Sequence, residues 1–146
     1  MRRLAVIAAA VAVAGCGGGP SIAVTDLPPE CAGDSAGLLK ALERAPRQVL
    51  VDGEPISHCL LAGASAAEVQ LLGTSLVTAA QQLGGRAAGD AHAAVELGYL
   101  IGAARRGSRR NGVTAELVRR LEAETGALGS HRAAYARGLR AGSATG

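Results

Sequence analysis

The sequence predicts an all-α fold, a small bundle of four to five helices with a minor β-hairpin near residues 48–57. Apolar residues recur at three- and four-residue spacing through most of the chain after residue 34, which is the period of an amphipathic helix. The strongest hairpin signal is short and lies around Asp52-Gly53. The chain has no Phe and no Trp, so we expect leucine, valine and alanine to fill the core.

The first elements are a short helix and the hairpin. Asp34 is a suitable N-cap for a helix that carries Leu38, Leu39 and Leu42 on one side and is closed by Pro46. Two strands, Gln48 to Val51 and Glu54 to Ser57, then flank Asp52-Gly53. This dipeptide is typical of a type I′ turn, because both central residues of that turn need positive φ.

Two longer helices follow. Ser65 and Glu68 form a capping box that opens a helix running to about Leu83, where Gly84-Gly85 should end it. Its predicted buried face consists of Val69, Leu72, Leu76, Ala80 and Leu83. Asp90 caps the next helix, which ends at Gly107 after two arginines.

This second long helix carries small residues every four positions, at Ala94, Gly98 and Gly102. A glycine in mid-helix costs about 1 kcal/mol relative to alanine. Close approach of another helix would offset that cost. The alternative is compositional, since the chain contains 21 glycines.

The last helical region opens at Thr114, where Val113 and Val118 have the spacing of a hydrophobic staple. Its apolar positions are Leu117, Leu121, Leu128, Tyr135 and Leu139. Gly126 and Gly129 either split residues 114–141 into two helices or weaken one long helix, and the sequence leaves both possibilities open.

The N-terminal segment has the pattern of a signal peptide. Arg2 and Arg3 precede an apolar run, Leu4 to Val13, that is much shorter than the roughly 20 residues of a membrane span. Val13, Ala14, Gly15 and Cys16 resemble the lipobox of bacterial lipoproteins. This resemblance implies that Cys16 takes a diacylglycerol and becomes the N-terminus after cleavage. Residues 1–15 are then a signal peptide, 16–30 a lipidated cysteine and flexible tether, and 31–146 one helical domain.

Ala12-Val13-Ala14 also offers an ordinary signal-peptide cleavage site, and leucine is usual in the lipobox where Val13 stands. The number of cysteines separates lipidation from simple secretion. Simple secretion would leave three cysteines in an oxidising compartment, whereas lipidation consumes Cys16 and leaves one pair. We therefore expect a disulfide between Cys31 and Cys59. The expected location is the cell envelope, lipid-anchored on the extracytoplasmic side of a membrane.

Charge is unevenly distributed along the chain. Without the signal peptide, 13 basic residues face 12 acidic ones, so overall charge does not favour nucleic acid as a partner. Residues 17–104 hold 4 basic and 9 acidic side chains, and residues 105–146 hold 9 basic and 3 acidic ones. The densest cluster is Arg105, Arg106, Arg109 and Arg110. It is a candidate for contact with lipid head groups or another polyanion, or it is a solvated loop between helices.

Two pairs of residues are candidates for chemistry. His92 and Glu96 lie four apart on a predicted helix and could present two ligands to a metal, but two ligands do not complete a site, and a solvated polar face is the favoured interpretation. His58 beside Cys59 could form a thiol-imidazole pair, but export and the expected disulfide argue against it. The sequence therefore predicts no complete catalytic or metal site and no cofactor.

Two functional hypotheses remain. The first is a non-catalytic envelope module, held to the membrane by its lipid anchor, that binds a protein partner or the membrane surface. The second is a small metal-binding protein or hydrolase that uses His92 and Glu96, or His58. A concave cluster that joins these histidines to further acids would favour the second.

Overall fold

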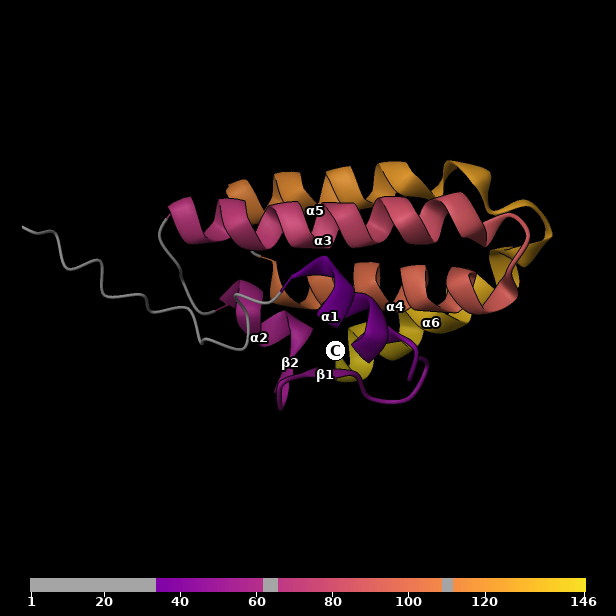
Figure 1. Ribbon diagram of the computed structural model, residues 1–146, viewed down its shortest axis with the longest axis horizontal. Coiled ribbons are helices and arrows are strands. Elements are labelled where there is room, and N and C mark those ends of the chain that lie inside the picture. The colour runs from indigo at the N-terminus through magenta and orange to yellow at the C-terminus, as the bar shows by residue number, and fades with distance from the viewer. Residues whose placement is uncertain (1–33, 62–65, 109–111) are drawn as a thin grey trace, which may run out of the picture.

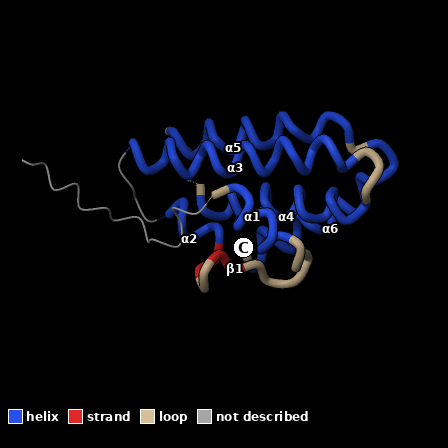
Figure 2. Tube along the Cα trace, viewed as in Figure 1, coloured by secondary structure: helices blue, strands red, loops and turns tan. Residues whose placement is uncertain are grey.

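The computed structural model describes residues 34–61, 66–108 and 112–146 of the 146-residue chain. The described residues form a mostly helical bundle with one small antiparallel hairpin (Figures 1 and 2). Its elements are α1 (Ser35–Leu42), β1 (Leu50–Val51), β2 (Glu54–Pro55), α2 (Ile56–Leu61), α3 (Ala66–Ala87), α4 (Ala91–Gly107), α5 (Val113–Ala123), two 3₁₀ turns (Glu124–Ala127 and Gly129–His131) and α6 (Arg132–Thr145). The predicted fold class is confirmed.

Helix α4 lies at the centre of the bundle. It contacts α1, α2, α3, α5 and α6, and 13 of its 17 residues are buried. A helix that is buried on all sides has an apolar surface all round, and α4 meets this requirement with alanine, leucine, valine and isoleucine. Helices α3 and α5 lie side by side on one side of α4 (Figure 1). None of the described helices is long and apolar enough to cross a membrane.

Helices α4 and α6 are parallel and pack backbone to backbone. A Cβ atom at Gly98 would overlap the carbonyl oxygen of Tyr135, and one at Gly102 would overlap that of Leu139. Reciprocally, a Cβ at Gly138 or Gly142 would overlap a carbonyl oxygen of α4. The prediction that Gly98 and Gly102 face a neighbouring helix is confirmed, and the neighbour is α6.

Helix caps follow the predicted pattern at two of the four predicted sites. The predicted cap at Thr114 was wrong, because α5 begins at Val113 and its N-cap is Gly112. The Asp34 carboxylate accepts a hydrogen bond from the backbone N–H of Gly37, and Asp90 accepts one from the N–H of His92, both at 2.8 Å. The predicted capping residue Ser65 lies outside the described residues.

The predicted end of α3 was wrong. The helix continues through Gly84-Gly85 to Ala87 instead of stopping near Leu83. Gly84 is buried, and a Cβ there would come within 2.6 Å of the Glu124 carbonyl oxygen. The glycine therefore allows the chain after α5 to approach α3, which the local sequence does not show.

The hairpin is shorter than predicted, although its turn is as expected. Asp52 and Gly53 have φ of 49° and 103°, the positive values that the dipeptide predicts. Strand β2 ends at Pro55, so the prediction that the strand reaches Ser57 was wrong. Helix α2 begins at Ile56 because Ile56, Cys59 and Leu60 then share one buried face at helical spacing. This short helix was not among the helices that the sequence predicted.

The last helical region is two helices, α5 and α6, joined by the 3₁₀ turns. Gly129 has a φ of 50° at this junction, a conformation that glycine adopts at little cost. The change of direction brings α6 back along α4 (Figure 1).

Tyr99 joins three parts of the domain. Its side chain is completely buried, and its hydroxyl accepts a hydrogen bond from the Val49 N–H at 3.0 Å. The same hydroxyl lies 3.0 Å from Oγ1 of Thr145 at the end of α6. Tyr99 therefore holds both the segment before the hairpin and the end of α6 against α4.

Candidate functional site

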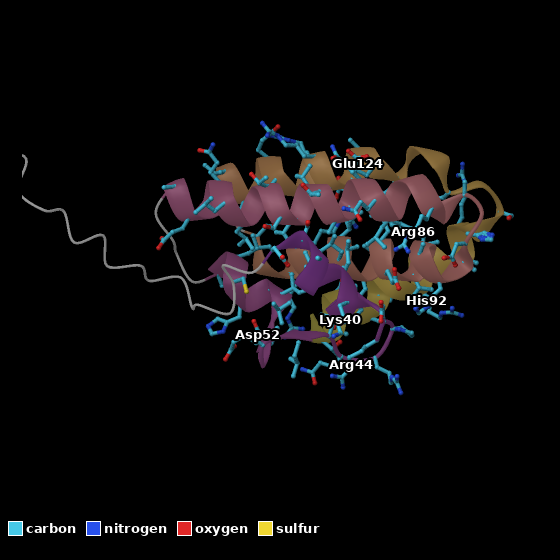
Figure 3. The ribbon with its side chains drawn as sticks, in the orientation of Figure 1. Lys40, Arg44, Asp52, Arg86, His92 and Glu124 are labelled. Atoms are coloured by element: carbon cyan, nitrogen blue, oxygen red, sulfur yellow. The ribbon has the colours of Figure 1, made fainter. Side chains whose placement is uncertain are left out.

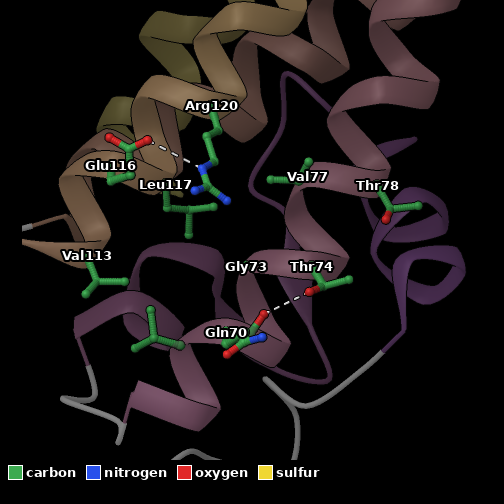
Figure 4. A pocket seen from close by; sticks show the side chains of 10 residues that line it. Gln70, Gly73, Thr74, Val77, Thr78, Val113, Glu116, Leu117 and Arg120 are labelled. Atoms are coloured by element: carbon green, nitrogen blue, oxygen red, sulfur yellow. Dashed lines mark hydrogen bonds and ion pairs between the residues drawn. The ribbon is translucent and has the colours of Figure 1, made fainter.

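A groove of about 430 Å³ runs between α3 and α5 (Figure 4). Its lining from α3 is Val69, Gln70, Gly73, Thr74, Val77 and Thr78, and its lining from α5 is Val113, Glu116, Leu117 and Arg120. At Gly73, a Cβ atom would lie in ordinary van der Waals contact with Cδ1 of Leu117, at 3.6 Å.

Charged residues border the groove on the α5 side alone. Arg119 donates to Oε2 of Glu116 from Nε at 2.9 Å, and Arg120 lies 3.4 Å from Oε1. The hydrogen bond from Arg119 holds the pKa of Glu116 below its usual value, and Arg120 adds to this effect. Val113, at the start of α5, leaves 62 % of its surface exposed.

The α3 side of the groove carries no charge. Glu68 and Arg86 are the nearest charged residues of α3, and the 17 residues between them are uncharged. We call the exposed or half-exposed side of this stretch the α3 face, and it consists of Gln70, Leu71, Thr74, Thr78 and Gln81. At 3.6 residues per turn these five positions fall within an arc of about 100°. Leu71 protrudes from the face with 68 % of its surface exposed.

The side chains of His92 and Glu96 lie together, and the third member of their group is Arg86. Nε2 of His92 lies 3.0 Å from Oε1 of Glu96, and a guanidinium nitrogen of Arg86 lies 3.4 Å from Oε2. The Glu96 side chain is 4 % exposed, whereas His92 and Arg86 are about half exposed (Figure 3). Burial raises the pKa of Glu96, and the positive charges of His92 and Arg86 oppose this rise. The group therefore joins the end of α3 to the start of α4.

His58 has a different partner from the one considered for catalysis. Its Nδ1 lies 2.5 Å from Oε2 of Glu54 on strand β2, four residues earlier, and both side chains are exposed. Cys59 is buried and is disulfide-bonded, so its sulfur does not titrate as a thiol. Its predicted partner, Cys31, lies outside the described residues, and the pairing stays a prediction. Among the described residues, no group of three or more His, Cys, Asp or Glu could hold a metal ion.

The two described arginines of the basic cluster have partners within the domain. Nη2 of Arg105 lies 2.7 Å from Oε1 of Glu122 on α5. Arg106 donates to the carbonyl oxygens of Ser143 and Ala144 at the end of α6, where a positive charge is favourable. Arg109 and Arg110 lie outside the described residues, as does Cys16. Contact of this cluster with head groups stays a prediction.

Sequence reasoning missed the groove, because Val69 was assigned to the buried face of the helix and the α3 face was not considered. A signal for the face was nevertheless present, namely a long exposed helix with 17 consecutive uncharged residues. Comparison of the chain with protein-family models, with curated proteins and with solved structures finds no match.

Proposed function

We propose that this chain is a lipid-anchored lipoprotein of the bacterial envelope whose helical domain is a non-catalytic interaction module. In this proposal the lipid on Cys16 holds the domain at the membrane, and residues 17–33 link it to α1. The contact surface is the α3 face together with the groove beside it.

The α3 face is the observation that carries the interaction role. The solvent-exposed surface of a small domain normally mixes charges of both signs, and the cores of protein interfaces are depleted of them. Between Glu68 and Arg86 the exposed side of α3 carries no charge, and Arg86 at the end of the helix is its one exposed charged residue. The other described helices of eight or more residues have exposed charged side chains as well, such as Lys40 on α1 and Arg137 on α6. The uncharged stretch of this helix therefore has the composition of an interface, with a groove of mixed apolar and polar lining along one side.

The catalytic alternative receives less support from the geometry. His92 and Glu96 lie with Arg86, a positive charge that would repel a cation at this position. His58 pairs with an exposed glutamate beside a cysteine that is already in a disulfide. Neither histidine faces the groove, whose titratable lining residues are Glu116 and Arg120.

Replacing Cys16 with serine tests the anchor. In cells that process lipoproteins, we expect the wild-type chain to fractionate with membranes and to gain the mass of a diacylglycerol. The Cys16→Ser variant should lose both properties, because serine has no thiol to acylate. Identical fractionation of the two chains, with no added lipid mass on the wild type, would contradict the proposed anchor.

Photo-crosslinking tests the interaction surface in the full-length chain. A photoreactive amino acid is placed at Gln70, on the α3 face, and in a matched chain at Arg44, which is exposed on the opposite side of the domain (Figure 3). We expect irradiation of cells to give a discrete covalent adduct from position 70 and none from position 44. If position 70 gives no adduct, the α3 face is not an interaction surface.

A further inference from the structure

We propose that the exposed face of α6 lies against an anionic lipid surface and that its arginines contact the phosphates of the head groups. This inference rests on the proposed function for the source of the lipid, because the anchor at Cys16 would hold the domain at a membrane. Three observations carry it, namely the charge of the face, the lack of partners for its arginines and the packing of α6 on α4.

The exposed face of α6 is positively charged, with no acidic residue to offset that charge. We call it the α6 face, and it consists of Arg132, Ala133, Arg137, Arg140, Ser143 and Ala144. At 3.6 residues per turn these positions fall within an arc of about 140°. Residues 125–146 contain no Asp and no Glu. The α6 face is therefore complementary in charge to an anionic surface.

The arginines of this face differ from those of α3, α4 and α5 in having no partner. On those helices, Arg86, Arg105, Arg119 and Arg120 pair with glutamates, and Arg106 donates to backbone carbonyl oxygens. Within the part of the chain that the structure describes, the three arginines of the α6 face make no ion pair and no side-chain hydrogen bond. Their guanidinium groups can therefore bind phosphate through paired N–H donors.

Packing on α4 determines how α6 can meet a membrane. An amphipathic helix that binds membranes by itself buries its apolar side at the boundary of the acyl chains. The inner side of α6 is not available for this, because Gly138 and Gly142 lie against the α4 backbone. The α6 face carries alanine, serine and arginine, with no large apolar side chain to insert. We therefore expect contact at the level of the head groups, driven by charge and weakened by salt.

This contact would also orient the domain. Helix α6 packs on α4 and lies on the side of α4 away from α3 (Figure 1). A domain that rests on α6 would therefore leave α3 on the side away from the lipid. The α3 face would stay accessible to a protein partner.

Vesicle binding of the full-length chain with Cys16→Ser tests this proposal, because that chain has no thiol to acylate at the anchor. The vesicles are phosphatidylcholine alone or phosphatidylcholine mixed with phosphatidylglycerol. We expect tighter binding to the mixed vesicles at about 0.1 M salt and loss of this difference at about 1 M salt. Adding Arg137→Gln and Arg140→Gln together should weaken binding to the mixed vesicles about thirtyfold, at about fivefold for each arginine.

Arg119→Gln with Arg120→Gln is the matched control, because it removes the same charge from exposed arginines on α5. It should weaken binding by no more than about twofold. Whatever the N-terminal apolar run contributes is the same in all these chains. Circular dichroism of each variant should match that of the parent chain, since all four arginines are exposed.

Three outcomes would overturn the proposed contact. They are equal binding to the two kinds of vesicle, equal binding by the α6 variant and its parent, and equal weakening by the α5 and α6 variants. Tighter binding to duplex DNA than to the mixed vesicles, lost in the α6 variant, would overturn lipid as the partner. Because Cys16 is serine throughout, none of these outcomes bears on the proposed anchor, and crosslinking from position 70 tests the α3 face separately.

Discussion

At the scale of single residues, the buried carboxylate of Glu96 gives the domain a pH-dependent stability. Burial is the largest influence on this group and raises its pKa in the folded state above 4.5. Between that value and the folded pKa, the folded protein holds a proton that the unfolded chain has released. The stability contribution of Glu96 therefore falls as the pH rises through this interval.

Glu96→Gln should remove this contribution. We expect the variant to show a smaller loss of unfolding free energy than the wild type when the pH is raised from about 4.5 toward neutrality. Urea unfolding at several pH values measures it. Glu116→Gln is the control with the opposite sign, because the pKa of Glu116 is lowered and its stabilisation is lost as the pH falls. If the unfolding free energy of Glu96→Gln falls with pH as steeply as that of the wild type, Glu96 is not the source of this pH dependence.

At the scale of elements, the parallel α4 and α6 pair depends on glycines that stand at matching positions on both helices. Gly98 and Gly102 on α4 meet the α6 backbone, and Gly138 and Gly142 on α6 meet the α4 backbone. Side chains at these positions would force the helices apart. The glycines that weaken each helix by itself are thus the ones that permit the contact between them.

Gly98→Ala should destabilise the domain, although alanine favours helix formation by about 1 kcal/mol. The new methyl group would overlap the Tyr135 carbonyl and lie 2.8 Å from the Leu139 nitrogen. Overpacking of this kind costs roughly 1–3 kcal/mol, and Gly98→Leu should cost more than Gly98→Ala. Thermal or urea unfolding measures both.

Gly85→Ala is the matched control for this test. Gly85 is also a helical glycine, but it is exposed and a Cβ there would meet nothing within 4 Å. This change should stabilise the domain by up to about 1 kcal/mol. If Gly98→Ala stabilises the domain as Gly85→Ala does, the close α4–α6 contact does not exist.

At the scale of the whole molecule, the disulfide at Cys59 is expected to connect the entry of the domain to α2. We predict that its partner is Cys31, which closes a loop of about 29 residues and stabilises the domain by roughly 3–4 kcal/mol through restriction of the unfolded chain. Peptide mapping of the unreduced protein identifies the pair, and reduction should lower the unfolding free energy. A peptide that joins Cys59 to Cys16 would contradict both this pairing and the acylation of Cys16.

The candidate site was only partly accessible from the sequence. The spacing of His92 and Glu96 placed both residues on one helix face, and in the structure the two side chains lie 3.0 Å apart. The interpretation as a solvated polar face did not anticipate that Glu96 is buried. Local spacing did not predict three other contacts, those made by Arg86, by Glu122 and by the carbonyl oxygens at the end of α6. Each of these groups lies on a different helix from the residue that it contacts. The groove likewise requires α5 to lie beside α3.

The sequence by itself determined the features that depend on neighbours along the chain. These are the helical class, the caps at Asp34 and Asp90, and the positive φ of Asp52 and Gly53, because side-chain periodicity, capping and turn geometry act over a few residues. Tertiary structure decided what each glycine does. Gly84-Gly85 lies within a helix, and residues 114–141 form two helices, because packing against α4 and against the chain after α5 outweighs local preference.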